Sequence, residues 1–540
     1  MNINNIKNFF LNDIILDWLQ LHGGKYGYKS NTNIEIDTFL HSFNNDLTNE
    51  VISFLCSHLL YKNLSIDEII YQIPNNLSIH NKINQTIEYI KLKKPIIYNP
   101  FLGDYNDIYG STSFIVRSDY LSIFFEIFNY QSQLNEPLSI NDDYYVINIK
   151  NIKIHNDTYC ISKTNKNDFH RASTHLFNHL LNHLLSFNNN LVFFITKKNN
   201  HLYLLHDFSN KRLTNKTQDA IISYRNILKN GNKLDPINNN NQIILPNLSN
   251  YDDYPWTSVK LSIAEKTKDI TLLWNCSSIQ RNKAFQHNIF TYHHPKLNAN
   301  ILGKTSKQAF ILDKIIDINR QNNITYSPRT IKNYLNTQII KNQQIQFIVD
   351  FETTNINNSS VLFLIGCICI HNNKHHSFNS FISNDFNVED NESTIIYQWL
   401  DYMNSITNNI VIHHWGNAEP SIFNSIIEKY HIDKDLISNI QWNDMLSMFK
   451  REPFVIKNVF SFGLKEICKQ LYSLGLISHI WDDNDIDGKT TLVYIANEIK
   501  INNSSNSFKS SQLVQSIIYY NKIDCLVLLD ILQFFKSITN

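Results

Sequence analysis

The chain has 540 residues with a formal net charge of 0, and 43% of its residues are hydrophobic and 12% aromatic. This length exceeds what one hydrophobic core supports and predicts about two to four domains, while the apolar content argues against global disorder. The balanced charge excludes an overall positive field, so binding to nucleic acid would depend on local clusters of basic residues.

Cysteine usage and apolar runs indicate the compartment. The seven cysteines are scattered and form neither a CxxC pair nor a metal-ligand spacing, which fits a reducing environment. The longest apolar run, residues 361–370, is about half the length of a membrane span, and we expect a buried strand there. Acids interrupt the apolar run near the N-terminus, which predicts an amphipathic helix and not a signal peptide. We therefore expect an intracellular protein that is neither secreted nor membrane-bound.

The apolar pattern in the first half of the chain alternates between helical and extended periods. Residues 1–95 predict helices, including 49–60 and 66–73, and residues 170–187 predict another helix. We expect strands at residues 96–98, 113–117, 144–150 and 191–195. The Asn- and Lys-rich stretch at 229–250 predicts an exposed loop or linker.

The C-terminal part of the chain has a different order of elements. Its pattern predicts strand, strand, strand, helix, strand, helix and further helices, which is typical of an α/β domain. The residues before it are mostly helical in pattern and predict a connecting module. We therefore expect an α/β protein with three segments, at residues 1–250, 251–342 and 343–540.

Two acids mark the first strand of that C-terminal domain. Asp350 and Glu352 lie in a β-forming run at residues 345–354, and a strand places alternate side chains on one face, about 7 Å apart over two residues. Two carboxylates on one buried face repel each other unless a cation lies between them. Two-metal phosphoryl chemistry uses such a site, with its ions about 3.5–4 Å apart. The alternative is a strand end with two solvated acids.

Further acids follow later elements of the same domain. Glu419 opens a predicted helix after a β-branched strand and a Gly turn, where the helix dipole favours negative charge. Tyr520 and Asp524 are four residues apart at the start of an apolar helix, so their side chains project side by side. Asp444 precedes a short predicted helix, and it is either an accessory acid of the site or a helix N-cap.

Basic residues recur near these acids, at Lys450, Arg451, Lys457 and Lys465. Each of them alone is typical of a solvated surface. Together, beside carboxylates that need a polyanionic substrate, they are candidate contacts to the phosphates of a nucleic acid.

The order of these acids resembles the DEDD exonuclease branch of the RNase H-like superfamily. That branch has Asp-x-Glu on a first strand, an acid after a later strand, and Tyr-x-x-x-Asp on a C-terminal helix. The stretches His414-Trp-Gly-Asn-Ala-Glu419, Phe462-Gly-Leu-Lys-Glu466 and Tyr520-Asn-Lys-Ile-Asp524 resemble one subgroup more closely. This subgroup is the YprB-like RNase H domain at the C-terminus of predicted RecB-family nucleases, including versions in giant DNA viruses. The resemblance covers residues 345–540.

This resemblance implies an RNase H-like fold, in which helices flank a mixed sheet, and a two-metal-ion phosphodiester hydrolase. Asp350, Glu352, Glu419 and Asp524 would hold two Mg²⁺ or Mn²⁺ ions, and Tyr520 would position the attacking water. Glu419 stands where most DEDD enzymes have Asp, a departure that the subgroup shares. The implied activity is hydrolysis of DNA or RNA, from 3′ ends, in the cytoplasm or nucleus of a host or in a viral factory. The resemblance does not indicate which proteins would be partners.

The same family carries a PD-(D/E)XK nuclease-like domain upstream, and residues 10–250 resemble it. Glu50 falls at the position of its early helix acid, and Lys150 retains the lysine of its acid-x-Lys motif. Ser113 stands where the first Asp is expected, and Asn148 replaces the acid of acid-x-Lys. Asp119 is about 20 Å from Ser113 along a strand, too far for one metal site. We expect this N-terminal domain to be degenerate and catalytically inactive, and to serve nucleic-acid contact or scaffolding.

Two alternatives stay open at this point. In the first, both nuclease folds are inactive, and the protein is a non-catalytic nucleic-acid-binding or scaffold protein. In the second, it is an assembly protein of a virus-like replicative complex. Cleavage of labelled oligonucleotides with a divalent ion separates the enzyme from both, and salt-dependent binding separates the two alternatives from each other.

Overall fold

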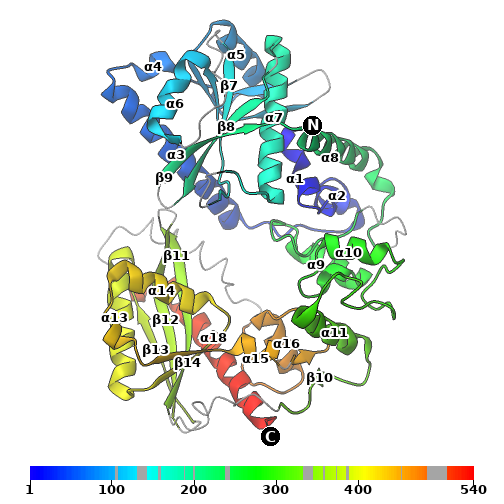
Figure 1. The fold of residues 1–540 in the computed structure, drawn as a ribbon, viewed down its shortest axis with the longest axis vertical. Helices are drawn as coiled ribbons and strands as arrows, with labels where there is room; N and C mark the ends of the chain where they lie inside the picture. The colour runs from blue at the N-terminus through cyan, green and yellow to red at the C-terminus, as the bar shows by residue number, and fades with distance from the viewer. Residues whose placement is uncertain are drawn as a thin grey trace. The chain divides into compact units, whose positions relative to one another are not determined.

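The structure is a computed structural model that divides into two compact units, which lie in the blue-to-green and green-to-red parts of Figure 1. Unit 1 comprises Met1–Thr32 and Leu40–Thr267, and unit 2 comprises Asn33–Phe39 and Lys268–Asn540. The structure describes residues 1–103, 108–130, 143–155, 160–187, 189–198, 201–237, 244–331, 345–356, 359–371, 374–384, 388–451, 453–482, 495 and 508–539.

Unit 1 contains a seven-stranded mixed sheet in the order β1-β2-β5-β7-β8-β9-β6. Its strands are β1 (Ile70–Gln72), β2 (Ile96–Tyr98), β5 (Phe114–Arg117), β6 (Asn129–Tyr130), β7 (Tyr144–Ile149), β8 (Leu191–Lys198) and β9 (His201–Phe208), and a separate pair is β3 (Phe101–Gly103) with β4 (Tyr109–Ser111). The α-helices in or mostly in this unit are α1 (Lys7–Phe10), α2 (Ile15–His22), α3 (Ile34–Tyr61), α4 (Ile66–Ile69), α5 (Ile79–Lys91), α6 (Leu121–Ile127), α7 (Asn165–Leu185), α8 (Lys211–Asn230) and α9 (Thr257–Thr267). The 3-10 helices are η1 (Ile3–Ile6), η2 (Gly23–Tyr26), η3 (Ser118–Tyr120) and η4 (Gly231–Lys233).

The central strand β7 is buried along its whole length, because side chains cover both faces of the sheet. Alternate residues of a strand point to opposite faces. Tyr144 and Val146 accordingly pack with Phe177 of α7 on one face. Tyr145 and Ile147 pack on the other face with side chains of α3 and α6. The polar residues that follow on the α7 face, Asn148 and Lys150, therefore point toward that helix.

The predicted strands of unit 1 are confirmed as β2, β5, β7 and the first part of β8, and the predicted helix at 170–187 is confirmed within α7. Residues 66–73 were expected to be one helix, but α4 ends at Ile69 and the chain continues as β1. Parallel pairing of Ile70 with Ile96 takes these residues into the sheet and overrides their helical pattern. The sequence did not indicate α6 or β9.

Unit 2 contains a five-stranded sheet in the order β13-β12-β11-β14-β15. Its strands are β11 (Ile345–Ile356), β12 (Ser359–His371), β13 (Lys374–Ile382), β14 (Ile410–His414) and β15 (Ile440–Asp444), and a separate pair is β10 (Tyr326–Ser327) with β16 (Val455–Ile456). Its helices are α10 (Ser278–Phe285), α11 (Ser306–Arg320), α13 (Val388–Ile406), α14 (Ala418–Tyr430), α15 (Met445–Arg451), α16 (Leu464–Ser473) and α18 (Gln512–Ser537). The 3-10 helices are η5 (Ile270–Leu272), η6 (Lys434–Leu436) and η7 (Phe508–Ser510).

The sheet of unit 2 is antiparallel on one side and parallel on the other. β11, β12 and β13 pair antiparallel, whereas β11, β14 and β15 pair parallel. Phe347, Val349 and Phe351 of β11 pack on one face with Trp399 of α13, and α18 contacts β11 and β12. The alternate residues of β11, Asp350 among them, point toward α18, to which Asp350 is hydrogen-bonded. Figure 1 shows α18, in red, running beside these strands.

The expectations for this unit are largely confirmed. Residues 361–370 form a buried strand within β12, and the helix expected after the third strand of the domain is α13. Strand β15 was not predicted, because the alternation in its sequence Ile-Gln-Trp-Asn-Asp is short and includes only two apolar residues. The mixed α/β architecture predicted from the sequence is confirmed.

The helical segment between the two sheets divides between the units. Its first helix, α9, belongs to unit 1, and α10 and α11 belong to unit 2. Within unit 2, Arg281 of α10 forms a buried ion pair of 2.8 Å with Asp269. The ring of Trp274 lies edge-on to Phe462, with centroids 5.4 Å apart. Of the helices in the described residues, none is long and apolar enough to span a membrane.

Candidate metal centre

Three acids from two distant parts of the chain converge beside the central strand of unit 2. Asp350 and Glu352 come from β11, and Asp524 comes from the middle of α18. One carboxylate oxygen of each lies within 4.8 Å of one oxygen of each of the others. The predicted strand and helix thus place these three side chains in one cluster. Three carboxylates at this spacing match the hard oxygen donors that bind Mg²⁺ and Mn²⁺.

Glu419 reaches the same cluster from a third element. Strand β14 ends at His414, Gly416 turns the chain with φ +84°, and Glu419 lies in the first turn of α14. Its side chain is buried, and its negative charge contributes to raising the pKa of Asp350, Glu352 and Asp524. Of the four acids expected as ligands, three thus have oxygens within 4.8 Å of one another, and Glu419 lies near them but outside that group of three.

One oxygen of Glu419 is buried without a hydrogen-bond partner among the described residues. The nearest basic atom to this Oε2 is Nδ1 of His414, at 3.6 Å, and that nitrogen is buried and unpartnered as well. Another buried acid of the domain provides a contrast, because Glu392 accepts hydrogen bonds from Leu362 N, Lys429 Nζ and Tyr430 Oη. A buried carboxylate oxygen without a donor is costly. This oxygen is accordingly suited to a ligand that the protein itself does not supply.

The electrostatics of the cluster favour a bound cation. Burial is the largest cause of the raised pKa of Asp350, followed by the charges of Asp524, Glu352 and Glu419. Burial also raises the pKa of Asp524 well above its ordinary range, and it raises the pKa of Glu352 to about 7. Carboxyls that resist ionisation in this way ionise readily when a divalent ion lies among them. The residues present fit such an ion.

A β-bulge lies beside the cluster. In the antiparallel ladder, Glu352 pairs with Leu364 but Thr353 pairs with Leu362, so Phe363 of β12 is the extra residue. Bulges bend a strand locally and redirect its side chains, and they are common next to active sites. This one follows directly after Glu352 and separates the acid-bearing part of β11 from its end.

Two residues that the sequence analysis did not select as site residues contact the acids. Asn521 of α18 is fully buried, and its Nδ2 donates to Oδ2 of Asp350 at 2.7 Å and to the main-chain O of Asp350 at 3.2 Å. Trp481 contributes its indole N–H. This group lies close enough to Asp524 to lower its pKa, although its geometry falls short of a regular hydrogen bond. Asn521 lies at a variable position of the Tyr-x-x-x-Asp motif, so the sequence alone did not indicate its contact with Asp350.

Lys465 and Tyr520 stand together at the edge of the cluster. The Lys465 Nζ lies 4.9 Å from the ring centroid of Tyr520 and 5.5 Å from that of Trp481. Its positive charge lowers the pKa of both Glu352 and Asp524. Tyr520 is buried on α18, one helical turn before Asp524. The structure thus brings a cation and a phenol beside the acids.

Asp444 binds backbone N–H groups in this region. Its Oδ1 accepts hydrogen bonds from Gly416 N and Leu446 N, both at 2.9 Å. The first bond fixes the turn that leads to Glu419, and the second is the bond that an N-cap makes at the start of α15. The neighbouring His413 is neutral, since burial lowers its pKa to about 3, and it joins Gln346 to Asn443 across three strands.

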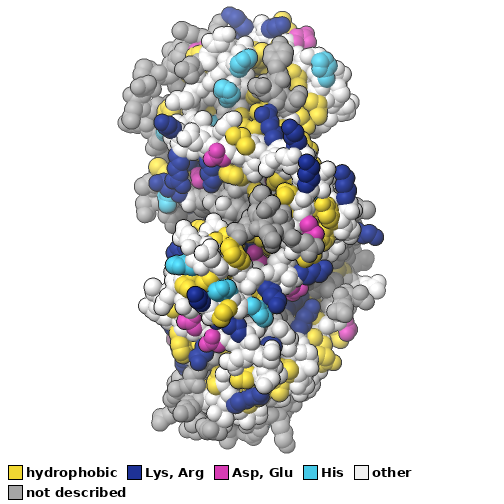
Figure 2. All heavy atoms as spheres, turned by 90° about the vertical axis from the view of Figure 1, so that its right-hand side faces the viewer, with side chains coloured by type: hydrophobic (Ala, Val, Ile, Leu, Met, Phe, Trp, Pro, Cys, Tyr) yellow, Lys and Arg dark blue, Asp and Glu magenta, His cyan; other side chains and the backbone are white. Residues whose placement is uncertain are grey.

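Lys450 and Lys457, two of the other basic candidates, contact residues outside the acid cluster. Lys450 stacks its Nζ over Trp274 at 5.7 Å and over Phe462 at 5.6 Å. Arg451 is exposed at the end of α15. Lys457 donates from Nζ to the main-chain O of Gln321. On the face shown in Figure 2, lysine and arginine side chains form several separate groups, as the net charge of 0 indicated.

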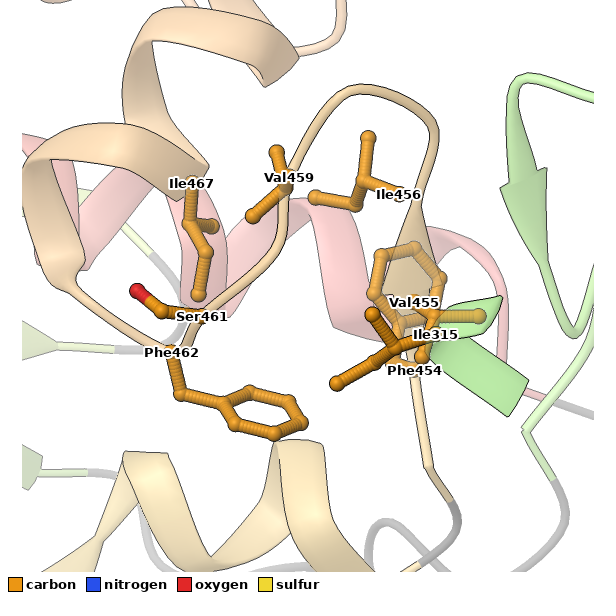
Figure 3. A pocket seen from close by; sticks show the side chains of 8 residues that line it. All are labelled: Ile315, Phe454, Val455, Ile456, Val459, Ser461, Phe462 and Ile467. Carbon is orange, nitrogen blue, oxygen red and sulfur yellow. The ribbon is translucent and has the colours of Figure 1, made fainter. Parts of the chain in front are cut away.

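A small apolar pocket of unit 2 is not part of this centre. It is lined by Ile315, Phe454, Val455, Ile456, Val459, Ser461, Phe462 and Ile467 (Figure 3). Its volume of about 10 Å³ is the space of one water molecule. None of the clustered acids lines it, so it is a packing gap and not a substrate site.

The residues predicted for a degenerate N-terminal site also come together in part. Ser113 Oγ donates to Asn148 Oδ1 at 3.2 Å and accepts from Ile149 N at 2.9 Å. Asn148 Nδ2 in turn donates to Thr174 Oγ1 of α7 at 2.8 Å. The first-acid and second-acid positions are thus neighbours, and neutral hydrogen bonds join them.

The two remaining members of that set have other surroundings. Glu50 of α3 forms an ion pair with Lys197, with its two oxygens 2.8 and 2.9 Å from Nζ. Burial lowers the pKa of Lys150, and burial followed by the charge of this lysine lowers the pKa of His170 on α7 to about 3. Asp119 pairs with Arg117 at 2.7 Å.

Comparison with known proteins supports the C-terminal part of this picture. A family model described as the RNase H superfamily matches residues 347–535. No curated protein matches the chain. The matched residues contain the five-stranded sheet, α18 and all four clustered acids, so the C-terminal part of unit 2 is an RNase H-like domain. This domain supports a nuclease-type function, the hydrolysis of nucleic acid.

Proposed function

We propose that the protein is a metal-dependent nuclease that removes nucleotides from 3′ ends of DNA or RNA at the acid cluster of unit 2. The observation that carries this proposal is the convergence of Asp350, Glu352 and Asp524 within 4.8 Å, with Glu419 beside them, inside an RNase H-like sheet. Acids at such spacing are costly to ionise unless a cation lies among them.

The four acids would hold two Mg²⁺ or Mn²⁺ ions. When bound, such ions supply the positive charge that lowers the pKa of an attacking water and neutralises the scissile phosphate. Other residues of the protein would orient the ligand carboxylate, the phosphate and the water. Asn521 fixes the Asp350 carboxylate, and Lys465 offers a cation to the phosphate. The Tyr520 hydroxyl orients the water, which is the role that the resemblance to DEDD exonucleases implies.

The N-terminal unit would not cleave nucleic acid. Where a PD-(D/E)XK nuclease has two acids, Ser113 and Asn148 make a neutral hydrogen-bonded pair. Neutral oxygens bind a divalent ion much more weakly than carboxylates do. We propose that this unit is the degenerate nuclease domain of a RecB-family protein of the giant-virus type, and that it contributes binding surface or scaffolding.

A direct assay tests the function. Purified protein is incubated with 5′-labelled single-stranded DNA or RNA and with Mg²⁺, Mn²⁺ or EDTA, in parallel with the Asp350→Asn variant. The proposal expects a ladder that shortens from the 3′ end, only with metal, and no cleavage by the variant. Equal cleavage by both proteins would place the activity elsewhere, and cleavage of a circular substrate would indicate an endonuclease.

The second candidate is a protein that binds nucleic acid without cutting it, and the neutral Ser113–Asn148 pair favours it for unit 1. It predicts a Kd for oligonucleotides that weakens steeply with salt, and no product with any divalent ion.

A further inference from the structure

Asn521 and Gly366 form a matched pair around the carboxylate of Asp350. Gly366 of β12 lies directly opposite Asp350 in the antiparallel ladder, so a side chain at either position points to the same face of the sheet. Asn521 fills the space above Gly366. A Cβ built on Gly366 would lie 1.8 Å from Oδ1 of Asn521, a distance that no pair of atoms tolerates without movement.

The hydrogen bonds of Asn521 show what this close approach achieves. Its Nδ2 donates to Oδ2 of Asp350 at 2.7 Å and to the main-chain O of the same residue at 3.2 Å. One amide group therefore holds both the side chain and the backbone of Asp350. A short bond from an amide to a carboxylate is charge-assisted and directional. One oxygen of this carboxylate also lies within 4.8 Å of an oxygen of Glu352 and of an oxygen of Asp524.

We propose that Asn521 is a positioning residue for metal binding, and that Gly366 is required because any larger side chain displaces it. This inference rests on the proposed metal centre but adds a residue that acts through the acids it contacts, chiefly Asp350 and also Glu352. The amide fixes the rotation of the Asp350 carboxylate before an ion arrives, so the ion meets a preformed ligand. Without the amide, Asp350 rotates more freely and repels its neighbours.

The test measures Mn²⁺ affinity directly, by calorimetric titration of the full-length protein. Asn521→Ala removes the amide, and Asn521→Leu removes it while keeping most of the volume. Loss of an outer-shell partner weakens metal binding by about 10–100-fold. We expect a loss in this range for both variants, with thermal unfolding close to that of the wild type.

A matched control separates positioning from simple loss of a buried amide. Asn404 also donates from Nδ2 to two oxygens, the main-chain O of Leu400 at 3.0 Å and of Leu436 at 3.2 Å, and neither belongs to an acid of the cluster. Asn404→Ala removes an amide of the same kind from the same unit. It should leave the Mn²⁺ affinity unchanged whatever it does to stability.

Substitution of Gly366 provides a second, independent test of the proposal. Gly366→Ala should weaken Mn²⁺ binding and lower the unfolding temperature, because the new methyl group displaces Asn521. In the double variant Gly366→Ala with Asn521→Ala, the clash with Oδ1 is gone but the 2.9 Å approach to Cε2 of Phe378 remains, so stability should return part of the way toward that of Asn521→Ala alone. Mn²⁺ affinity should stay low. Recovery of stability without recovery of Mn²⁺ affinity is the result expected for two residues that share one contact.

The outcomes are distinct. Wild-type Mn²⁺ affinity in Asn521→Ala and Asn521→Leu overturns the inference and leaves the nuclease proposal standing if the wild type cleaves. Absence of Mn²⁺ binding by the wild-type protein overturns both. Tight Mn²⁺ binding that weakens in the Asn521 variants, in a protein that cleaves nothing, supports the positioning role while the nuclease proposal fails.

Discussion

A carboxylate oxygen of Asp350 lies within 4.8 Å of one from Asp524, although one residue lies on the first strand of the sheet and the other on helix α18 near the C-terminus. Burial first, and then the charges of neighbouring carboxylates, raise the pKa of both carboxyls. Two acids held so close in a poorly solvated site are stabilised by a cation between them. A divalent ion between these acids is therefore the component that we propose for this arrangement.

Asp350→Asn removes a ligand and one negative charge. We predict that the rate of oligonucleotide cleavage falls by at least about 1,000-fold, because several kcal/mol of charge stabilisation depend on this site. The unfolding temperature of the metal-free variant should rise, because repulsion within the cluster decreases. Asp401→Asn, at an exposed position of α13, is the control and should match the wild type in both measurements. Full activity of Asp350→Asn would contradict the assignment.

Tyr520→Phe tests the role of the phenol. We expect kcat to fall by about 100-fold, because a misplaced nucleophile loses that much rate. Mn²⁺ affinity should stay the same, because the aromatic ring and its contact with Lys465 are retained. Tyr519→Phe is the matched control, since this neighbouring tyrosine is half exposed. An equal loss in both variants, or an unchanged kcat in Tyr520→Phe, would remove Tyr520 from the mechanism.

Lys465→Gln removes the cation beside the acids. We predict a weaker Kd for oligonucleotides and a salt dependence whose slope is smaller by about 1, as expected for one lost phosphate contact. Lys469→Gln, four residues later on α16 and exposed, serves for comparison. The salt dependence is obtained from binding isotherms at several KCl concentrations with Ca²⁺ in place of Mg²⁺. Identical slopes for the two variants would show that Lys465 contacts no phosphate.

The metal-free protein should lose stability as the pH rises. In the folded protein the pKa of Glu352 is raised from 4.5 to about 7, so its proton is held more tightly than in the unfolded chain. The stability contributed by this proton is present below the ordinary pKa and is lost as the pH approaches 7. Buried Asp17 of unit 1 has a pKa raised to about 7 and contributes with the same sign.

A variant isolates the contribution of the cluster to this pH dependence. Melting curves in EDTA across this pH range are compared for the wild type and Glu352→Gln, which keeps Asp17 and lacks the titrating group. We predict a smaller decrease in unfolding temperature for Glu352→Gln. Added Mn²⁺ at the upper end of the range should raise the unfolding temperature of the wild type more than that of the variant. Parallel curves with and without Mn²⁺ would contradict this prediction.

Local patterns were sufficient to predict the elements that carry the acids. Alternation in β11 placed Asp350 and Glu352 on one face, and the four-residue spacing placed Tyr520 beside Asp524. The RNase H-like fold and a mixed α/β architecture were likewise predicted and confirmed. The strands and helices depend on short-range periodicity, which a single sequence contains, whereas the RNase H-like fold was predicted from the resemblance of the acid motifs to a known family.

Features that depend on pairing between distant segments were not predicted. Strand β15 forms because it pairs with β14, although its own residues are half polar. Gly366 interrupts an apolar strand, and such an interruption signals a close approach of another group. Its partner Asn521 becomes evident only when α18 packs on β12. The neighbourhood of Lys465 and Trp481 likewise depends on tertiary packing.

The most direct test of the central claim is the anomalous scattering of Mn²⁺ in crystals of the full-length protein. The account predicts anomalous peaks within coordination distance of Asp350, Glu352 and Asp524, with Glu419 as a further ligand or beside one, and no such peaks in Asp350→Asn crystals. A map in which Mn²⁺ is absent from these four acids, at concentrations that support cleavage, would contradict it.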